Sequence, residues 1–323
     1  MDTKKIAYLL LNEAGIGIVL FALCLLFSLF VPAFASMNNI SNIFTQISIN
    51  TVIAVGMTFV ILLGGIDLSV GSVLALCTIL AGLTITKESL PLSAAIVLSV
   101  IVSMAAGMAC GLFNGWVSER WKIHPFVVTL GMLNIARGAV LQVSNSRTIY
   151  SFPKEFNAVG TVSYFGIPLI FVVAVLLVLF GHFILKKTVF GRMIYAIGNN
   201  EEAVRLSGHN VKFYKVAAFV ICGATVGLAA ILYMLRLNIA SPILGNGFEL
   251  SAIAAVVIGG TSMSGGKGSL IGTLLGAAII GVLNNGLLLV GMGDFARQMV
   301  TGIIIVAAVV LDTYRAKVSR MLI

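Results

Sequence analysis

The stretch GGIDLSVGS, residues 64–72, places an aspartate and two serines between two uncharged segments. NTVIAVGMTFVILL precedes it and VLALCTILAGLTIT follows it, and neither segment carries a charge. Two apolar segments joined by a polar, glycine-containing turn are typical of membrane helices that are interrupted where the chain bends. We expect Gly64 and Gly65 to loosen the end of the first helix, and Asp67 and Ser69 to cap the start of the second.

The composition indicates that the whole chain is an integral membrane protein. Hydrophobic residues make up 59% of the 323 residues and charged residues only 10%, whereas soluble domains carry about 25% charged residues. A chain with so little polar surface has the lipid bilayer as its solvent. The net charge of +9 is typical of cationic cytoplasmic loops. It does not indicate nucleic-acid binding, since no basic run is long enough to line a groove.

Ten segments are apolar enough to be interpreted as membrane spans, because about 20 residues of helix cross about 30 Å of hydrocarbon. The sequence therefore predicts an all-α, polytopic membrane protein with a single transmembrane domain over residues 1–323. The eighth span is short and ends in glycine, so its crossing is in doubt. The spans lie at approximately 15–35, 46–63, 70–86, 91–115, 125–143, 166–185, 215–236, 249–260, 269–291 and 297–312.

The distribution of lysine and arginine predicts that both termini are cytoplasmic. With ten spans, most of the 20 basic residues lie on the side of the N-terminus, as the positive-inside rule requires. Eight or twelve spans would keep both termini on this side, but an odd number would not. The opposite side receives only Lys87, Arg147, Lys154 and Arg297.

The longest polar stretch, KKTVFGRMIYAIGNNEEAVRLSGHNVKFYK at 186–215, is cytoplasmic in this topology. A short surface helix is expected at EEAVRLSG. Asn199 or Asn200 can cap it, the two glutamates suit the positive end of its dipole, and Gly208 can end it. The residues alone leave two interpretations, a solvated connector or a docking surface for a cytosolic partner.

The second glycine-rich stretch, IGGTSMSGGKGS at 258–269, does not match a phosphate-binding loop. That loop requires G-x-x-x-x-G-K-[ST], but Thr261 stands at the leading position and Gly268 follows Lys267. The chain therefore carries no nucleotide site of its own. No nucleophile–base pair, carboxylate dyad or metal-ligand spacing stands out, so we expect neither an enzyme nor a cofactor or metal. The four cysteines lie in apolar runs without CxxC spacing and are expected to be packing residues.

Small residues recur four positions apart within several spans, which predicts close packing of helix backbones in lipid. These positions are Gly107, Gly111 and Gly115, then Gly223 and Gly227, then Gly272 and Gly276.

Polar residues at membrane depth are the candidates for a solute pathway, because their insertion is costly unless it serves packing or function. Asp67 and Ser69 are either an interfacial helix cap or part of a pathway or gate. Arg137 shares a helix face with Asn134, and it either pairs with an acid on another span or bonds a polar solute. Four further amides either bond helices together or line a cavity for a hydroxyl-rich, neutral ligand. They are Asn50, Asn114, Asn284 and Asn285.

Four stretches resemble signature segments of the ribose-type sugar permeases of ATP-binding cassette importers. They are AVGMTFVILLGGIDLSVGS (54–72), FGRMIYAIGNNEEAVRLSG (190–208), IAAVVIGGTSMSGGKGSLIGTLLGA (253–277) and LNNGLLLVG (283–291). Their order and spacing match from about residue 38 to the C-terminus. The resemblance implies a multi-pass subunit of the bacterial inner membrane. It also implies three kinds of partner: a second permease subunit in a homodimer, a pair of cytosolic ATPases, and a periplasmic or lipoprotein sugar-binding protein.

The resemblance also implies roles for two segments. The loop at about 186–214 corresponds to the coupling-helix loop that contacts the ATPase, with candidate contacts at Gly191, Arg192, Asn199, Glu201, Glu202, Arg205 and Gly208. GIDLSVGS corresponds to a family hallmark on the cytoplasmic side, consistent with a gate or a helix-breaking turn. The expected function is import of a monosaccharide or similar small polyol by alternating access, driven by the partner's ATP hydrolysis.

Three rival functions remain on the residues alone. In an ion-coupled secondary transporter, Asp67 would carry the coupling proton or sodium ion. A membrane enzyme would need a catalytic constellation, and a channel would need a selective pore lining, and neither is visible in the sequence.

Overall fold

The computed structural model describes the backbone of residues 3–87 and 89–321, and the side chains of residues 15–87 and 89–310. Within them lie thirteen helices and four strands of two residues each. The elements are α1 (Thr3–Phe30), α2 (Met37–Leu62), α3 (Val70–Ile85), α4 (Leu92–Trp121), α5 (Pro125–Val143), β1 (Ile149–Tyr150), α6 (Lys154–Thr161), β2 (Ser163–Tyr164), β3 (Ile167–Pro168), α7 (Leu169–Lys187), α8 (Val189–Asn199), α9 (Glu201–Leu206), α10 (Val211–Leu237), β4 (Ile239–Ala240), α11 (Phe248–Ile258), α12 (Leu270–Leu289) and α13 (Asp294–Met321).

Six of these helices are long and apolar enough to cross a membrane, which confirms a multi-pass membrane protein. They are α2, α4, α5, α7, α10 and α12. Shorter apolar helices cover Gly15–Phe30 within α1, and the whole of α3 and α11. α4 continues six residues past the predicted end of its span at residue 115, to Trp121.

α2 is the central helix, and its side chains are buried over most of its length. Ser36 caps its start by accepting a hydrogen bond from the backbone of Asn39. α10, α12, α7 and α11 pack around it. By contrast, α4 and α7 expose large apolar side chains such as Ile101, Leu112, Leu179 and Phe180, as expected for helices at the lipid boundary.

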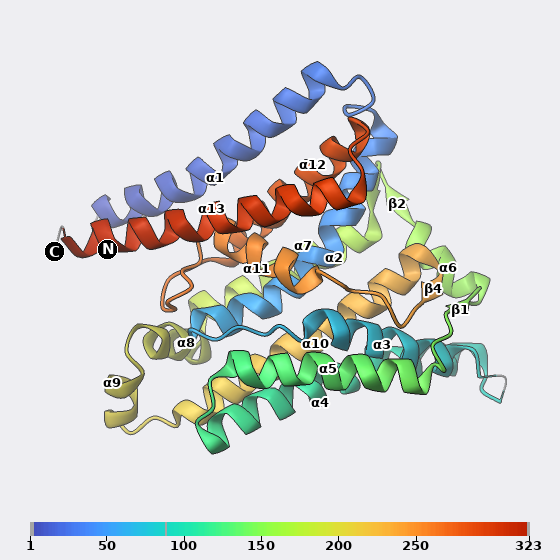
Figure 1. Ribbon diagram of the computed structural model, residues 1–323, viewed down its shortest axis with the longest axis horizontal. Helices are drawn as coiled ribbons and strands as arrows, with labels where there is room; N and C mark the ends of the chain where they lie inside the picture. Colours follow the sequence, from blue (N-terminus) through green and yellow to red (C-terminus); the bar gives the residue numbers. More distant parts are fainter. Residues whose placement is uncertain (1–2, 88, 322–323) are drawn as a thin grey trace.

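The two ends of the bundle differ in character (Figure 1). α1 begins and α13 ends at the end that also carries α8 and α9, which we call the α8–α9 end. The opposite end, the strand end, carries α6 and the antiparallel pairs β1–β4 and β2–β3. These strands are a departure from the all-α prediction, and pairs of two residues are too short to give a period-2 signal in sequence.

Two helices are too short to cross the bundle and start inside it. α3 has 16 residues and α11 has 11, or about 24 Å and about 17 Å at 1.5 Å per residue. Each follows an irregular loop, residues 63–69 before α3 and residues 241–247 before α11, and each begins well inside the bundle (Figure 1). The predicted shortness of the eighth span is thus confirmed by α11.

The glycine spacings predicted from sequence do bring helix backbones together. A Cβ atom on Gly107 of α4 would collide with the carbonyl oxygen of Gly223 of α10, and the reverse also holds. Gly272 of α12 meets Gly259, directly after α11, in the same way. The four cysteines are free, and Cys77 and Cys222 are buried, in keeping with their expected packing role.

Candidate functional site

Asp67 forms a closed polar cluster with Ser69 and Asn114 inside the bundle. Its Oδ1 accepts hydrogen bonds from the Ser69 backbone nitrogen at 2.9 Å and from the Ser69 hydroxyl at 2.6 Å. The Asn114 amide of α4 donates to Asp67 Oδ2 at 3.4 Å and to Ser69 Oγ at 3.0 Å. All three side chains are buried, and protein groups satisfy their polar atoms in place of water except at Asn114 Oδ1, which has no partner among the described residues.

The predicted capping of α3 by these side chains is wrong in detail. Ser69 occupies the N-cap position, but its side chain makes no capping hydrogen bond. Asp67 instead bonds the backbone two residues ahead, which closes a local turn before the helix begins. The space beside this cluster, bounded by Val73, Cys110 and Val226, has no room for a water-sized sphere. The helices around the cluster are therefore tightly packed at this point.

α5 holds both loops that precede the short helices. The Thr129 hydroxyl donates to the carbonyl oxygen of Ile66 at 3.2 Å. Two turns further along α5, the Arg137 guanidinium donates to the carbonyl oxygens of Pro242 at 2.5 Å and Leu244 at 3.0 Å, and to the Asn246 side chain at 2.7 Å. Arg137 is therefore a tether for the loop 241–247. Sequence reasoning missed this role of Arg137. Its acceptors are mainly backbone carbonyls, which every residue has, so no residue type in the sequence indicates them.

Asn134 lies apart from the contacts of Arg137. It is exposed, and its amide donates to the Leu130 carbonyl of its own helix at 3.1 Å. Asn134 and Arg137 are one turn apart on α5, but their side chains bond different groups.

The remaining amides contact other helices at separate places. Asn285 of α12 and Asn39 of α2 bond each other reciprocally at 2.9 Å. Asn50 of α2 donates to the Ser251 carbonyl of α11 at 3.5 Å. Asn284 accepts from Thr301 of α13 at 3.4 Å. These contacts link helices, and the amides of Asn50, Asn284 and Asn285 are not part of the Asp67 cluster.

The predicted surface helix is confirmed as α9. Asn200 is its N-cap and accepts from the Ala203 nitrogen at 3.0 Å, and Gly208 follows its end with φ +82°. Glu202 and Arg205 form an exposed ion pair one turn apart. The Glu202 carboxylate raises the pKa of Arg205 above its usual value, so the guanidinium remains charged.

The other residues predicted from the resemblance for the loop at about 186–214 lie on α8. Gly191 is buried against the Leu185 backbone, where a Cβ atom would collide, whereas Arg192 is exposed. Asn199 donates to the Gly266 carbonyl at 3.3 Å and does not cap α9.

Three of the four motif stretches singled out in the sequence meet at the α8–α9 end. The Gly266 nitrogen donates to the Leu62 carbonyl at 2.9 Å. A Cβ atom on Gly198 of α8 would collide with the same carbonyl and with Gly266. The end of α8, the end of α2 and the loop 262–268 are therefore in direct backbone contact. Leu62, the residue of α2 in this contact, precedes Asp67 by five residues in the sequence. We call this contact the glycine junction.

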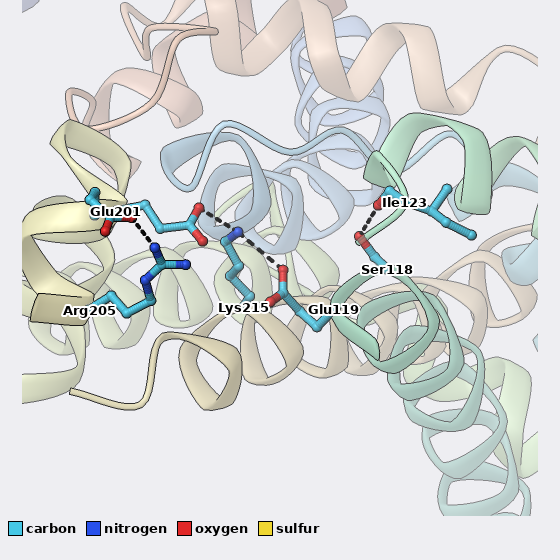
Figure 2. Close-up of polar contacts among 7 residues, drawn as sticks. Ser118, Glu119, Ile123, Glu201, Arg205 and Lys215 are labelled. Atoms are coloured by element: carbon cyan, nitrogen blue, oxygen red, sulfur yellow. Dashed lines mark hydrogen bonds and ion pairs between the residues drawn. The ribbon is translucent and has the colours of Figure 1, made fainter. Parts of the chain in front are cut away.

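Two functional candidates were missed in the sequence, Glu119 and Lys215. The Lys215 ammonium of α10 lies between the Glu201 carboxylate of α9, at 2.6 Å, and the Glu119 carboxylate of α4, at 3.1 Å (Figure 2). No spacing rule joins residues so far apart in the chain, so only the fold brings them together.

Residues 39–309 match the protein family described as "branched-chain amino acid transport system / permease component". No solved structure matches the chain.

Several curated proteins are similar to this chain over nearly its whole length. The ribose import permease protein of Escherichia coli strain K12 is 40% identical over 299 residues, which cover 91% of this chain and 92% of the relative. The ribose import permease protein of Bacillus subtilis strain 168 is 41% identical, covering 94% and 93%. The D-allose transport system permease protein of E. coli K12 is 38% identical, covering 88% and 86%.

Proposed function

Because the chain belongs to the family of branched-chain amino acid transport system permease components, we propose that it is the membrane subunit of an ATP-driven importer of a monosaccharide or similar small polyol. The observation that carries this proposal is the near full-length similarity to permeases named for ribose and D-allose. ATP is hydrolysed by a separate cytosolic ATPase, and a periplasmic or lipoprotein binding protein delivers the solute. Two copies of the chain form the membrane unit.

The proposed topology has ten spans in the bacterial inner membrane, with both termini and the α8–α9 end in the cytoplasm. Two observations support it. The basic residues concentrate on that side, and α1 begins at the end of the bundle where α13 finishes (Figure 1). The strand end then faces outward, toward the binding protein.

The proposed mechanism is alternating access. The ATPase docks on α9 through Glu201, Glu202 and Arg205, and its nucleotide cycle shifts the populations of inward- and outward-facing states. The glycine junction supports this mechanism, because it joins the end of α8 directly to the segment that leads to Asp67. Asp67, Ser69 and Asn114 are the candidates for the closed gate, and the other polar candidates are assigned to helix contacts near the pathway.

Reconstituted transport tests this proposal. The chain is placed in liposomes with the ATPase and binding protein encoded beside it, and uptake of labelled ribose, D-allose, L-arabinose and leucine is followed. We expect uptake of a sugar that requires ATP on the α8–α9 side and persists in the presence of an ionophore. Uphill uptake by the chain alone would contradict ATP coupling. Preference for leucine would contradict the sugar assignment.

A charge-reversal variant tests the docking surface. Glu201→Lys, Glu202→Lys and Arg205→Glu together are expected to abolish stimulation of the ATPase and sugar uptake, while insertion into the membrane is unchanged. The matched control is Glu155→Lys on α6, which is also exposed but lies at the strand end. Normal uptake by the triple variant would rule out α9 as the docking site.

A further inference from the structure

We propose that Lys215 and Glu119 are positioning residues that hold the docking helix α9 in place through a releasable ion pair with Glu201. This inference rests on the proposed docking role of α9. All three residues of the bridge lie in this chain, so the bridge can be tested without a partner protein.

The bridge joins three elements through one ammonium group. Lys215 stands in the second turn of α10, Glu119 in the last turn of α4, and Glu201 in the first turn of α9 (Figure 2). The side-chain exposure is 10% for Glu119, 20% for Lys215 and 43% for Glu201. The two carboxylates that share the lysine therefore differ strongly in their access to water.

This difference decides which pair is permanent. A buried carboxylate that loses its cation is strongly destabilised, whereas an exposed carboxylate is readily hydrated. Glu119 already has one oxygen, Oε2, that is buried without a hydrogen-bond partner in the described part of the chain. Lys215 therefore stays with Glu119, and Glu201 is free to leave without stranding a buried charge.

α9 depends on this tether because little else fixes it. The helix has only six residues, which is too short to be stable without tertiary contacts. Val204 is its one buried residue and packs with Ile197 and Val211. One buried side chain holds the helix weakly against rotation, and the ion pair from Glu201 to Lys215 fixes that rotation. The bridge thereby presents Glu202, Arg205 and Leu206 in one orientation, and preorganisation of this kind strengthens docking.

Hydrogen exchange of the full chain in nanodiscs tests the bridge directly. Amides of residues 199–210 are compared in wild type, Glu201→Gln, Lys215→Met and Lys215→Arg. Exchange is expected to be about two- to fivefold faster in the first two variants, as for an exposed pair, and near wild type in Lys215→Arg. Raising the salt concentration to about 0.5 M should accelerate exchange more in wild type than in Glu201→Gln, because salt screens the Glu201–Lys215 pair only in wild type. Lys212→Met, at an exposed lysine on the same helix, is the control and should match wild type.

Wild-type exchange rates in Glu201→Gln at both salt concentrations would overturn the inference. Should Lys215→Met fail to fold because Glu119 is left unpaired, the double variant Lys215→Met/Glu119→Gln removes the stranded charge and carries the same test. A salt effect as large as that of wild type in the double variant would also overturn the inference. Binding of the ATPase is measured separately. If the exchange results are as expected but the chain binds no ATPase, the proposed function is rejected and the inference about the bridge stands.

Discussion

Gly71 and Gly245 meet backbone to backbone where the two short helices begin. A Cβ atom on Gly71 would collide with the Gly245 carbonyl and with the Glu249 carboxylate. The Glu249 side chain in turn accepts a hydrogen bond from the Gly247 nitrogen at 3.2 Å. The start of α3 is thus packed directly against the backbone of the loop before α11, beside the Glu249 carboxylate.

Replacing Gly71 with alanine is expected to destabilise the protein by about 1–3 kcal/mol, because the added methyl group must displace backbone. The measurement is thermal unfolding in detergent micelles. The matched control is Gly131→Ala on α5, where an added Cβ meets nothing within 4 Å. We expect the control to be neutral or slightly stabilising, since alanine favours the helix. Equal melting temperatures for the two variants would refute the close contact.

Two variants of Asp67 distinguish the contribution of its hydrogen bonds to the turn from the contribution of its charge. Asp67→Ala leaves the Ser69 backbone and hydroxyl donors without their acceptor and removes one of the two acceptors of the Asn114 amide. It is expected to cost about 1–3 kcal/mol of unfolding free energy. Asp67→Asn keeps one acceptor for Ser69. Its new amide can donate to Asn114 Oδ1, which is buried without a partner among the described residues, so we expect a cost below about 1 kcal/mol. Chemical unfolding in micelles compares the two, and an asparagine variant as damaged as the alanine variant would contradict this reading.

The tether from Arg137 to the loop 241–247 predicts a local change in dynamics. Arg137→Met removes three charge-assisted hydrogen bonds, and exchange of the Leu244 and Gly247 amides is expected to rise about tenfold or more. Arg137→Lys should fall between wild type and methionine, because an ammonium cannot reproduce the planar fork. Asn134→Ala, one turn earlier on the same helix, is the control. Unchanged exchange in Arg137→Met would show that other contacts hold the loop.

The reciprocal amide pair of Asn39 and Asn285 predicts coupling between α2 and α12. Each single leucine variant deprives the remaining buried amide of its interhelical hydrogen bonds and is expected to lose about 1 kcal/mol of unfolding free energy. The double leucine variant should recover part of that loss, because both polar groups are then absent. A double-mutant cycle on unfolding in micelles gives the coupling energy. Additive losses would mean that the two amides do not act as a pair.

The sequence was sufficient wherever the signal was local. Hydropathy identified the six helices that are long and apolar enough to cross a membrane. Glycine spacing identified positions on α4 and α10 where helix backbones approach closely, and the residues from Asn200 to Gly208 identified α9 with its cap and its end. Each of these signals lies within a single helix or turn, where period and residue type act directly on the backbone.

The sequence was insufficient wherever a contact joins distant segments. The bridge through Lys215 and the glycine junction at Leu62 join elements whose spacing along the chain carries no rule. The Arg137 contacts involve backbone carbonyls, which every residue possesses. At Ser69, competition between two local hydrogen bonds decided the outcome, and the turn closed by Asp67 replaced the expected side-chain cap.

The backbone contact between Gly107 and Gly223 has a consequence for motion. Helices that slide past one another do so across a layer of side chains that change rotamer, and here that layer is missing. We therefore expect α4 and α10 to move together as a unit during any rearrangement. Relative displacement must be taken up at boundaries filled by side chains, such as the one where Val55 and Phe59 of α2 pack beside Val178 of α7.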